Sequence, residues 1–280
     1  ASCHSRISPW PVHVGVSHGV GYAENGRIVF LQLRLDEYAG DALQPLTAVA
    51  YRRLFAAARA CGYPHFLRIW NYFPNINQEC SSLERYRSFC AGRHQALMAE
   101  LAECEIHLPA ACALGVVPSN PDRDVGSLHL YALAARDPGR QIENPRQVSA
   151  FHYPPQYGQR SPSFSRAVLK AWGEREYHLY ISGTASIVGH HSQHTDLMAQ
   201  LDETLLNLET LVTHASCSIP VPLRLELLKV YCRSAVDPAL LRARIIQVFG
   251  AETPMLFLRA DICRQELLIE IEGMAVSVAR

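Results

Sequence analysis

The feature that most constrains the fold of this chain is an internal repeat of strand and helix patterns. In the second half, the apolar run at residues 225–232 predicts a strand. A helix should follow from Asp237-Pro238 to just before Gly250, because Asp caps helices, Pro fits the first turn and Gly ends them. In the first half, residues 66–73 predict the matching strand and residues 83–90 the matching helix.

Each copy of the repeat extends in both directions. Upstream of each copy, the pattern predicts a strand and a long helix, and downstream it predicts two more strands. Upstream, the first copy has a strand at 27–31 and a helix at 45–61 that Gly62 ends, and the second has a strand at 177–182 and a helix at 197–211. Downstream, the first copy has strands at 110–117 and 128–134, and the second has strands at 255–262 and 267–275. This order predicts an α+β fold in which helices cover one face of each sheet.

We place the boundary between the two pseudo-symmetric halves at residue 140, so that residues 1–140 and 141–280 each carry one copy. Residues 137–176, at the junction, are rich in Pro, Gly, Tyr and Arg, and we expect them to form a long loop. Long ordered loops often carry function, so this segment is a candidate wall of a site.

The last predicted strand carries two carboxylates in an apolar run. Glu270 and Glu272 share one face, because side chains alternate along a strand. The pattern is typical of an edge strand with one solvated face. The alternative is that the carboxylates are buried, where a carboxyl group has a raised pKa and can donate a proton near neutral pH.

Composition limits the classes of function. The 26 basic and 26 acidic residues cancel and form no basic run, which gives no support to nucleic-acid binding. No apolar run is long enough for a membrane span and no signal peptide is visible, so we expect a cytoplasmic protein. The nine cysteines are scattered without a CxxC pair, as expected for reduced thiols.

A group of His190, His191, His194 and Asp196 resembles the ligands of a non-haem iron site. It lies between a predicted strand and helix, where Asp196 is explained as an N-cap. We therefore expect no metal and no cofactor.

The second half resembles the Rid/YjgF family in Ile181-Ser182-Gly183-Thr184-Ala185, in Lys229-Val230-Tyr231 and in the Ile269–Glu272 ending. The whole chain resembles the chorismatases more specifically. The matching motifs are Leu67–Tyr72, Glu84–Arg93, Glu143–Gln147, Tyr153-Pro154, Ile181–Ser186 and Ala260–Arg264. This resemblance implies two Rid/YjgF-like halves, related in fold to the trimeric chorismate mutases, and hydrolysis of the enolpyruvyl ether of chorismate to pyruvate.

The resemblance also implies a catalytic acid. Cleavage of an enol ether requires protonation of its terminal methylene carbon, and Glu270 lies at the position of the family's catalytic Glu. Laid over the first half, Glu270 falls near His129 and Glu272 near Tyr131, which implies one competent site per chain. Glu272 remains the competing candidate.

Chorismate is a dianion, so its site needs cations and hydrogen-bond donors. For substrate binding we expect Arg93, Arg146, Arg160, Tyr153 and Tyr157. Two further positions bear on the product. The resemblance implies Cys263 as a second catalytic residue and Ala185 as a substrate-binding residue. A Cys at position 263 is typical of the hydroxybenzoate-forming members, whereas those members would prefer Gly at position 185.

The expected products are therefore pyruvate and 3- or 4-hydroxybenzoate, and the alternative to hydroxybenzoate is 3,4-dihydroxycyclohexa-1,5-dienoate. A Rid-like enamine or imine hydrolase is a second possibility, although Rid proteins carry an Arg about fifteen residues before the Glu and this chain has none until Arg259. A non-catalytic metabolite-binding protein and an iron dioxygenase are further alternatives. Besides the substrate, we expect no nucleic-acid or membrane partner, and a monomer or a trimer.

Overall fold

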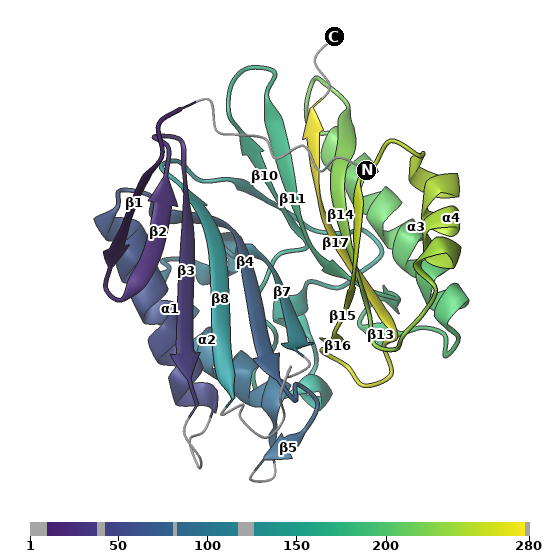
Figure 1. The fold of residues 1–280 in the computed structure, drawn as a ribbon, viewed down its shortest axis with the longest axis horizontal. Coiled ribbons are helices and arrows are strands. Elements are labelled where there is room, and N and C mark those ends of the chain that lie inside the picture. Colours follow the sequence, from purple (N-terminus) through teal and green to yellow (C-terminus); the bar gives the residue numbers. More distant parts are fainter. Residues whose placement is uncertain (1–9, 38–42, 81–82, 117–125, 278–280) are drawn as a thin grey trace.

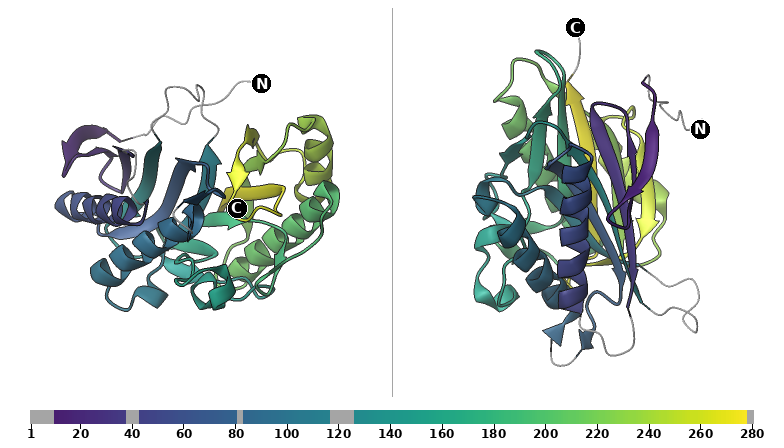
Figure 2. Two further views of the ribbon diagram at one scale, coloured as in Figure 1. Left: turned by 90° about the horizontal axis from the view of Figure 1, so that it is seen from below. Right: turned by 90° about the vertical axis from the view of Figure 1, so that its left-hand side faces the viewer.

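The computed structural model describes residues 10–37, 43–80, 83–116 and 126–277. Two mixed sheets lie side by side, and helices cover one face of each (Figures 1 and 2). The first sheet has the spatial order β1 (His13–Ser17), β2 (Val20–Glu24), β3 (Ile28–Asp36), β8 (Ser127–Ala135), β4 (His65–Pro74), β7 (Ala110–Val116) and β16 (Asp261–Ile262). The second has the order β15 (Met255–Arg259), β14 (Leu223–Cys232), β17 (Ile269–Ser277), β11 (Tyr177–Thr184), β10 (Ala167–Ala171) and β9 (Arg140–Ile142).

The helices are α1 (Leu43–Ala60) and α2 (Arg85–Glu100) on the first sheet, and α3 (Leu197–Ser216) and α4 (Pro238–Phe249) on the second (Figure 1). Short pieces complete the chain: the pairs β5 (Glu79–Cys80) with β6 (Leu83–Glu84) and β12 (Ile187–Val188) with β13 (His191–Ser192), and 3₁₀ turns η1 (Cys104–Ile106), η2 (Ala150–His152) and η3 (Pro155–Tyr157). None of the described helices is long and apolar enough to cross a membrane.

The internal repeat is confirmed by the strand pairing. In the first sheet, β8 lies antiparallel between β3 and β4, and β4 is parallel to β7. In the second, β17 lies antiparallel between β11 and β14, and β14 is parallel to β15. The predicted register also agrees, because Tyr72 is opposite His129 and Tyr231 is opposite Glu270. The fold is therefore α+β with two similar halves, as predicted.

The predicted helix ends are confirmed by local chemistry. The Asp237 carboxylate accepts a hydrogen bond from the backbone N–H of Ala239 at the start of α4. Gly62 follows α1 with φ +80°, and Gly250 follows α4 with φ +82°, a backbone conformation that L side chains disfavour. Both of these helices therefore end where the sequence indicates, whereas α2 begins at Arg85 and continues to Glu100, well past the predicted range of 83–90.

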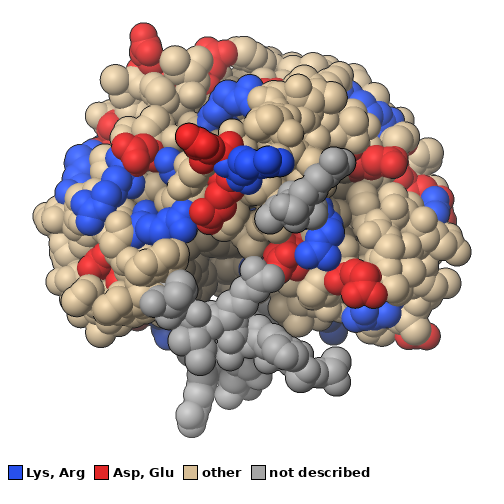
Figure 3. Space-filling view, turned by 90° about the horizontal axis from the view of Figure 1, so that it is seen from above, with Lys and Arg blue, Asp and Glu red and all other residues tan. Residues whose placement is uncertain are grey.

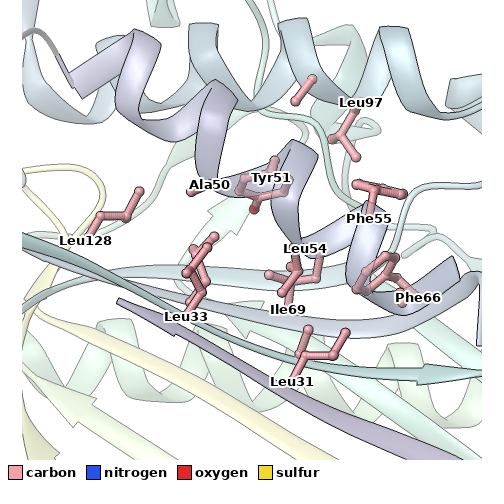
Figure 4. Close-up of a cluster of buried hydrophobic side chains, with 14 of the residues drawn as sticks. Leu31, Leu33, Ala50, Tyr51, Leu54, Phe55, Phe66, Ile69, Leu97 and Leu128 are labelled. Atoms are coloured by element: carbon pink, nitrogen blue, oxygen red, sulfur yellow. The ribbon is translucent and has the colours of Figure 1, made fainter. Parts of the chain in front are cut away.

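A separate apolar core lies under each pair of helices. In the first half, side chains of α1 pack on β3, β4 and β8, as Figure 4 shows for Leu54, Leu31 and Ile69. In the second half, Leu201, Leu205, Leu208 and Leu211 of α3 pack on the other sheet at helical spacing. These two cores fix the helix-covered faces and leave the opposite strand faces for other contacts.

Two expectations about the elements are wrong. The strand that carries Glu270 is not a solvated edge strand, because β17 is paired on both sides and Glu270 and Glu272 are only 4% and 2% exposed. The junction segment 137–176 is not a continuous loop, because β9 and β10 pair with each other and β10 pairs with β11. The apolar run in β10 therefore extends the second sheet.

The sheets are joined where the chain crosses between them. The segment predicted as one strand at 255–262 divides at Ala260: β15 pairs with β14 in the second sheet, and β16 pairs with β7 in the first. Arg233 secures this crossing by donating hydrogen bonds to the Asp261 carboxylate and to the backbone carbonyl of Ile262. Residues of both copies of the repeat thereby come together at the junction.

On the face shown in Figure 3, Lys and Arg side chains are interspersed with Asp and Glu side chains, in keeping with the zero net charge. The eight described cysteines are free thiols, and Cys3 lies outside the described residues.

Candidate active site

A cavity of about 440 Å³ opens at the junction of the two halves. Its walls come from α2, from the segment between residues 153 and 166, and from the strands β11 and β17 of the second sheet. A smaller pocket of about 30 Å³ adjoins it and shares Tyr86, Phe164, Gly183, Cys263 and Glu270 with the larger one. Glu270 therefore lies where the two spaces meet.

The Glu270 carboxyl is buried without a hydrogen-bonding partner among the described side chains. Burial raises its pKa, the neighbouring charge of Glu272 raises it further, and Arg68 opposes them, with a resulting pKa of about 8. At neutral pH this carboxyl is protonated. It is a buried acid facing a cavity, which is the arrangement that general acid catalysis requires.

Gly183 makes room for this carboxyl. A Cβ atom added at position 183 would collide with Oε1 of Glu270 and would lie 2.7 Å from its Cδ. The glycine of the Ser182-Gly183-Thr184 segment on β11 is thus explained by the close approach of the Glu270 side chain, because any larger residue would occupy the same space.

Glu272 has the opposite environment. Its carboxylate accepts hydrogen bonds from Trp70 Nε1 (2.8 Å), from the Tyr231 hydroxyl (3.0 Å) and from Arg68, and pairs with Lys229 Nζ at 3.0 Å. Burial opposes its ionisation, but Arg68 and Lys229 outweigh that effect and hold its pKa below the usual value. Glu272 is therefore an ionised, fully engaged carboxylate that cannot donate a proton, which favours Glu270 over it as the acid.

Three arginines that line these spaces have buried N–H groups without hydrogen-bonding partners among the described residues. The buried Arg93 on α2 has Nε and Nη2 without hydrogen-bonding partners in the described structure, and it lines the smaller pocket. Arg166 and Arg264 line the larger cavity, and each has one such buried nitrogen. A buried guanidinium N–H without a partner is costly, so these groups fit a site that binds an anion.

Most of the other predicted site residues lie in the same cavity. Tyr153, Tyr157, Ala185 and Cys263 all line it. The Tyr153 hydroxyl accepts a hydrogen bond from Arg166 at 2.7 Å, and Arg264 lies 4.0 Å from the centre of the Tyr157 ring, so the aromatic rings fix both cations. Burial raises the pKa of the Cys263 thiol to about 12, which keeps it neutral.

The structure places two of the expected binding residues, Arg146 and Arg160, away from the cavity. Arg146 donates a hydrogen bond to Asn207 Oδ1 at 2.5 Å and pairs with Glu203 at 2.5 Å, so its charge is already neutralised by the start of α3. Arg160 is exposed to solvent, and neither arginine lines the larger cavity or the smaller pocket.

The two cations that replace them were absent from the predicted site, although the sequence carries a signal for one. Arg264 directly follows Cys263 in a motif that matches the chorismatases, and its position on a turn after β16 could have suggested a cavity-facing side chain. Arg166 has no such local signal. It reaches the cavity because Tyr153 and the carbonyl of Val148, both distant along the surface loop, accept its hydrogen bonds.

The histidine group has a structural explanation. The Asp196 carboxylate accepts hydrogen bonds from the backbone N–H groups of Met198 and Ala199, which confirms it as the N-cap of α3. His194 contacts Glu203, while His190 stacks edge-on against Tyr157. Within the described ranges, no three His, Cys, Asp or Glu side chains converge in a way that could hold a metal ion.

The Arg that Rid-like hydrolases would require is also displaced. Arg259, the arginine on β15, is exposed at the edge of the second sheet. The cavity instead takes its cations from α2, from the junction segment and from the turn after β16. This arrangement departs from the Rid pattern.

Comparison with known proteins agrees with this geometry. Residues 6–134 match the family model described as chorismatase FkbO/Hyg5-like, N-terminal. A 3-hydroxybenzoate synthase from Streptomyces hygroscopicus is 32% identical, with 94% of this chain and 78% of that protein covered. A chorismatase from the same organism is 35% identical, with 94% and 76% covered.

The same relationship is found among solved structures. The crystal structure of a chorismatase superposes with a TM-score of 0.80 at 33% sequence identity, covering 94% of this chain and 79% of that one. The similarity spans both halves of the repeat and the junction between them, where the buried carboxyl and the unpaired arginines meet. This chain belongs to the chorismatase family.

Proposed function

We propose that this protein is a chorismatase that cleaves the enolpyruvyl ether of chorismate, releasing pyruvate and leaving a hydroxybenzoate. The observation that carries the proposal is a protonated, buried Glu270 at the meeting point of two spaces lined by arginines with unpaired N–H groups. The relatives named chorismatase and 3-hydroxybenzoate synthase support the same substrate.

Binding of the substrate follows from its two carboxylates. Arg166 and Arg264 face the larger cavity, and Arg93 faces the smaller pocket next to Glu270. Charge-assisted hydrogen bonds from these guanidinium groups would satisfy nitrogens that are otherwise unpaired. Tyr157 stacks on Arg264 and limits the orientations that this cation can adopt.

The chemical step is proton transfer from Glu270 to the terminal methylene carbon of the enol ether. Because the carboxyl pKa is about 8, Glu270 holds its proton at neutral pH and can donate it to the methylene carbon. When water adds to the resulting oxocarbenium ion, the hemiketal breaks between the pyruvyl carbon and the ether oxygen, so the ring keeps that oxygen. When a ring hydroxyl displaces pyruvate instead, the C–O bond to the ring breaks and the ring loses one proton as it becomes aromatic. The Glu270 carboxylate recovers its proton from the captured nucleophile.

The product depends on what captures the cation. Capture by water consumes one water molecule and gives pyruvate with the dihydroxycyclohexadienoate. Aromatisation consumes no net water and gives pyruvate with hydroxybenzoate. We propose the second outcome, with 3- or 4-hydroxybenzoate as product, because the neutral Cys263 thiol lines the cavity beside Glu270 and a relative is named 3-hydroxybenzoate synthase.

The test is incubation of the protein with chorismate in the presence of EDTA, followed by measurement of pyruvate and by chromatography of the ring products. Pyruvate with 3- or 4-hydroxybenzoate is the expected result. Pyruvate with a non-aromatic diol would place the enzyme among the simple hydrolases and leave Cys263 a packing residue. Absence of pyruvate would refute the proposal and favour a Rid-like imine hydrolase or a binding protein.

Glu270→Gln tests the acid. The amide has nearly the same shape but no acidic proton, so pyruvate release should fall by about 10²- to 10⁴-fold while the fold persists. The matched control is Glu252→Gln, which makes the same chemical change at an exposed position in the turn after α4 and should leave turnover unchanged. Near-normal activity of Glu270→Gln would show that another group supplies the proton.

A further inference from the structure

The two carboxylates of β17 differ in their hydrogen-bonding and ion-pair partners. Glu270 and Glu272 are two residues apart and face the same side of the strand, about 7 Å from each other by strand geometry. Glu272 receives donors from both halves of the molecule: Arg68 and Trp70 belong to β4 of the first sheet, and Lys229 and Tyr231 to β14 of the second. Glu270 receives none from the described residues.

The surroundings of Glu270 contain groups from several elements. Cys112, Cys263 and Tyr86 have pKa values raised by burial, so all three stay neutral while Glu270 titrates. Of the charged groups, Glu272 has the larger effect on the Glu270 pKa and Arg68 opposes it. The titratable and charged groups that line the two spaces or act on the Glu270 pKa are Arg68, Glu79, Glu84, Tyr86, Arg87, Arg93, Cys112, Tyr153, Tyr157, Arg166, Cys263, Arg264, Glu266 and Glu272.

We propose that Glu272 is a positioning residue whose negative charge, fixed by donors from both sheets, keeps the neighbouring Glu270 carboxyl protonated and ready to donate. This role rests on the proposed function, in which Glu270 is the acid. Glu272 itself does not touch the reacting atoms, because four donors occupy its oxygens.

Glu272 affects the protonation of Glu270 because the two carboxyl groups lie close together with little solvent between them. A carboxylate held at a fixed short distance disfavours ionisation of its neighbour, because two like charges repel strongly where water cannot screen them. The ion pairs with Arg68 and Lys229 hold Glu272 ionised, and Arg68 reaches it only when β4 packs against the second sheet. Docking of the two halves therefore creates the acid as well as the cavity.

Three variants separate this role from simple structural support. Glu272→Gln removes the negative charge and should lower the Glu270 titration midpoint by about one to two pH units from its value of about 8. Arg68→Met removes the opposing cation while Lys229 still pairs with Glu272 and keeps it ionised, so this variant should raise the midpoint. The double variant Arg68→Met/Glu272→Gln removes both fully buried charges and leaves only Lys229, which is 26% exposed, without its partner. It should therefore keep the fold where the single change disrupts it, and it should show a smaller downward shift.

The midpoint is read by infrared spectroscopy of the protonated carboxyl C=O band over a pH series, with Glu270→Gln identifying the band. This readout needs no substrate. Circular dichroism verifies the fold of each variant, and pyruvate release from chorismate is followed over the same pH range.

The proposal is overturned if the midpoint in folded Glu272→Gln, or in the double variant, equals that of the wild type. An equal downward shift in Arg68→Met would overturn it too, since the sign should reverse. Shifted midpoints in a protein that releases no pyruvate would refute the chorismatase proposal and leave the positioning role intact. Pyruvate release with unshifted midpoints would refute the positioning role alone.

Discussion

The buried acid should make the protein less stable at neutral pH than it would be without that acid. Glu270 has a folded-state pKa of about 8 against a usual value of 4.5. A raised acid pKa means that the folded state binds the Glu270 proton more tightly than the unfolded chain does. The stability that this tighter proton binding contributes is complete below the usual pKa and is lost as pH rises towards the folded-state value. Glu270→Gln removes this loss.

The magnitude follows from the two pKa values. Between about pH 5 and about pH 7, the unfolded chain releases the Glu270 proton while the folded protein retains it, which costs the wild type about 2 to 3 kcal/mol of unfolding free energy. Because Glu270 is 4% exposed, solvent screening reduces this figure little. The difference in unfolding free energy between Glu270→Gln and the wild type should grow in favour of the variant by that amount across this range.

The assay is urea unfolding of both proteins at the two pH values, with the comparison restricted to the difference between them so that all other titrating groups cancel. Cys263→Ala is the matched control. It removes a side chain from the same pocket, but its thiol has a pKa of about 12 and stays neutral, so its effect should not change with pH. A Glu270→Gln difference that is constant with pH would refute the argument that the buried carboxyl is protonated.

Other predictions test the remaining parts of the site. Gly183→Ala should abolish pyruvate release while the fold survives, because the added Cβ displaces the Glu270 carboxyl; normal turnover would show that this close contact is dispensable. Arg93→Met should raise KM for chorismate at least tenfold and stabilise the unliganded protein by about 1 to 3 kcal/mol, since it removes a buried, partly unpaired cation. Arg146→Met should do the reverse, lowering stability by removing the ion pair with Glu203 while KM stays the same. Pyruvate release by the wild type should fall about tenfold per pH unit above pH 8 as Glu270 ionises, and a flat profile there would contradict its role as acid.

The pattern of the sequence accounts for most of the architecture. Hydrophobic periodicity and helix-end residues predicted the elements of both repeats, because strand and helix spacing and capping are local properties. Asp237 and Gly250, for example, bound α4 as expected. The segment at residues 255–262 shows the limit of this reasoning: its apolar run predicts a strand, but only the packing of two sheets decides that the chain changes partner at Ala260.

The candidate site divides in the same way. Motifs in the sequence pointed to Glu270, Arg93, Tyr153 and Cys263, and the composition of the junction segment pointed to Tyr157; all five line the two spaces. Packing of the two sheets was needed to establish that Arg68 and Lys229 pair with Glu272, that Arg146 pairs with Glu203, and that Arg166 and Arg264 supply the unpaired cations. The physical reason is that the charge state of a carboxyl or the availability of a guanidinium depends on burial and on partners distant in the chain, which the order of residues does not specify.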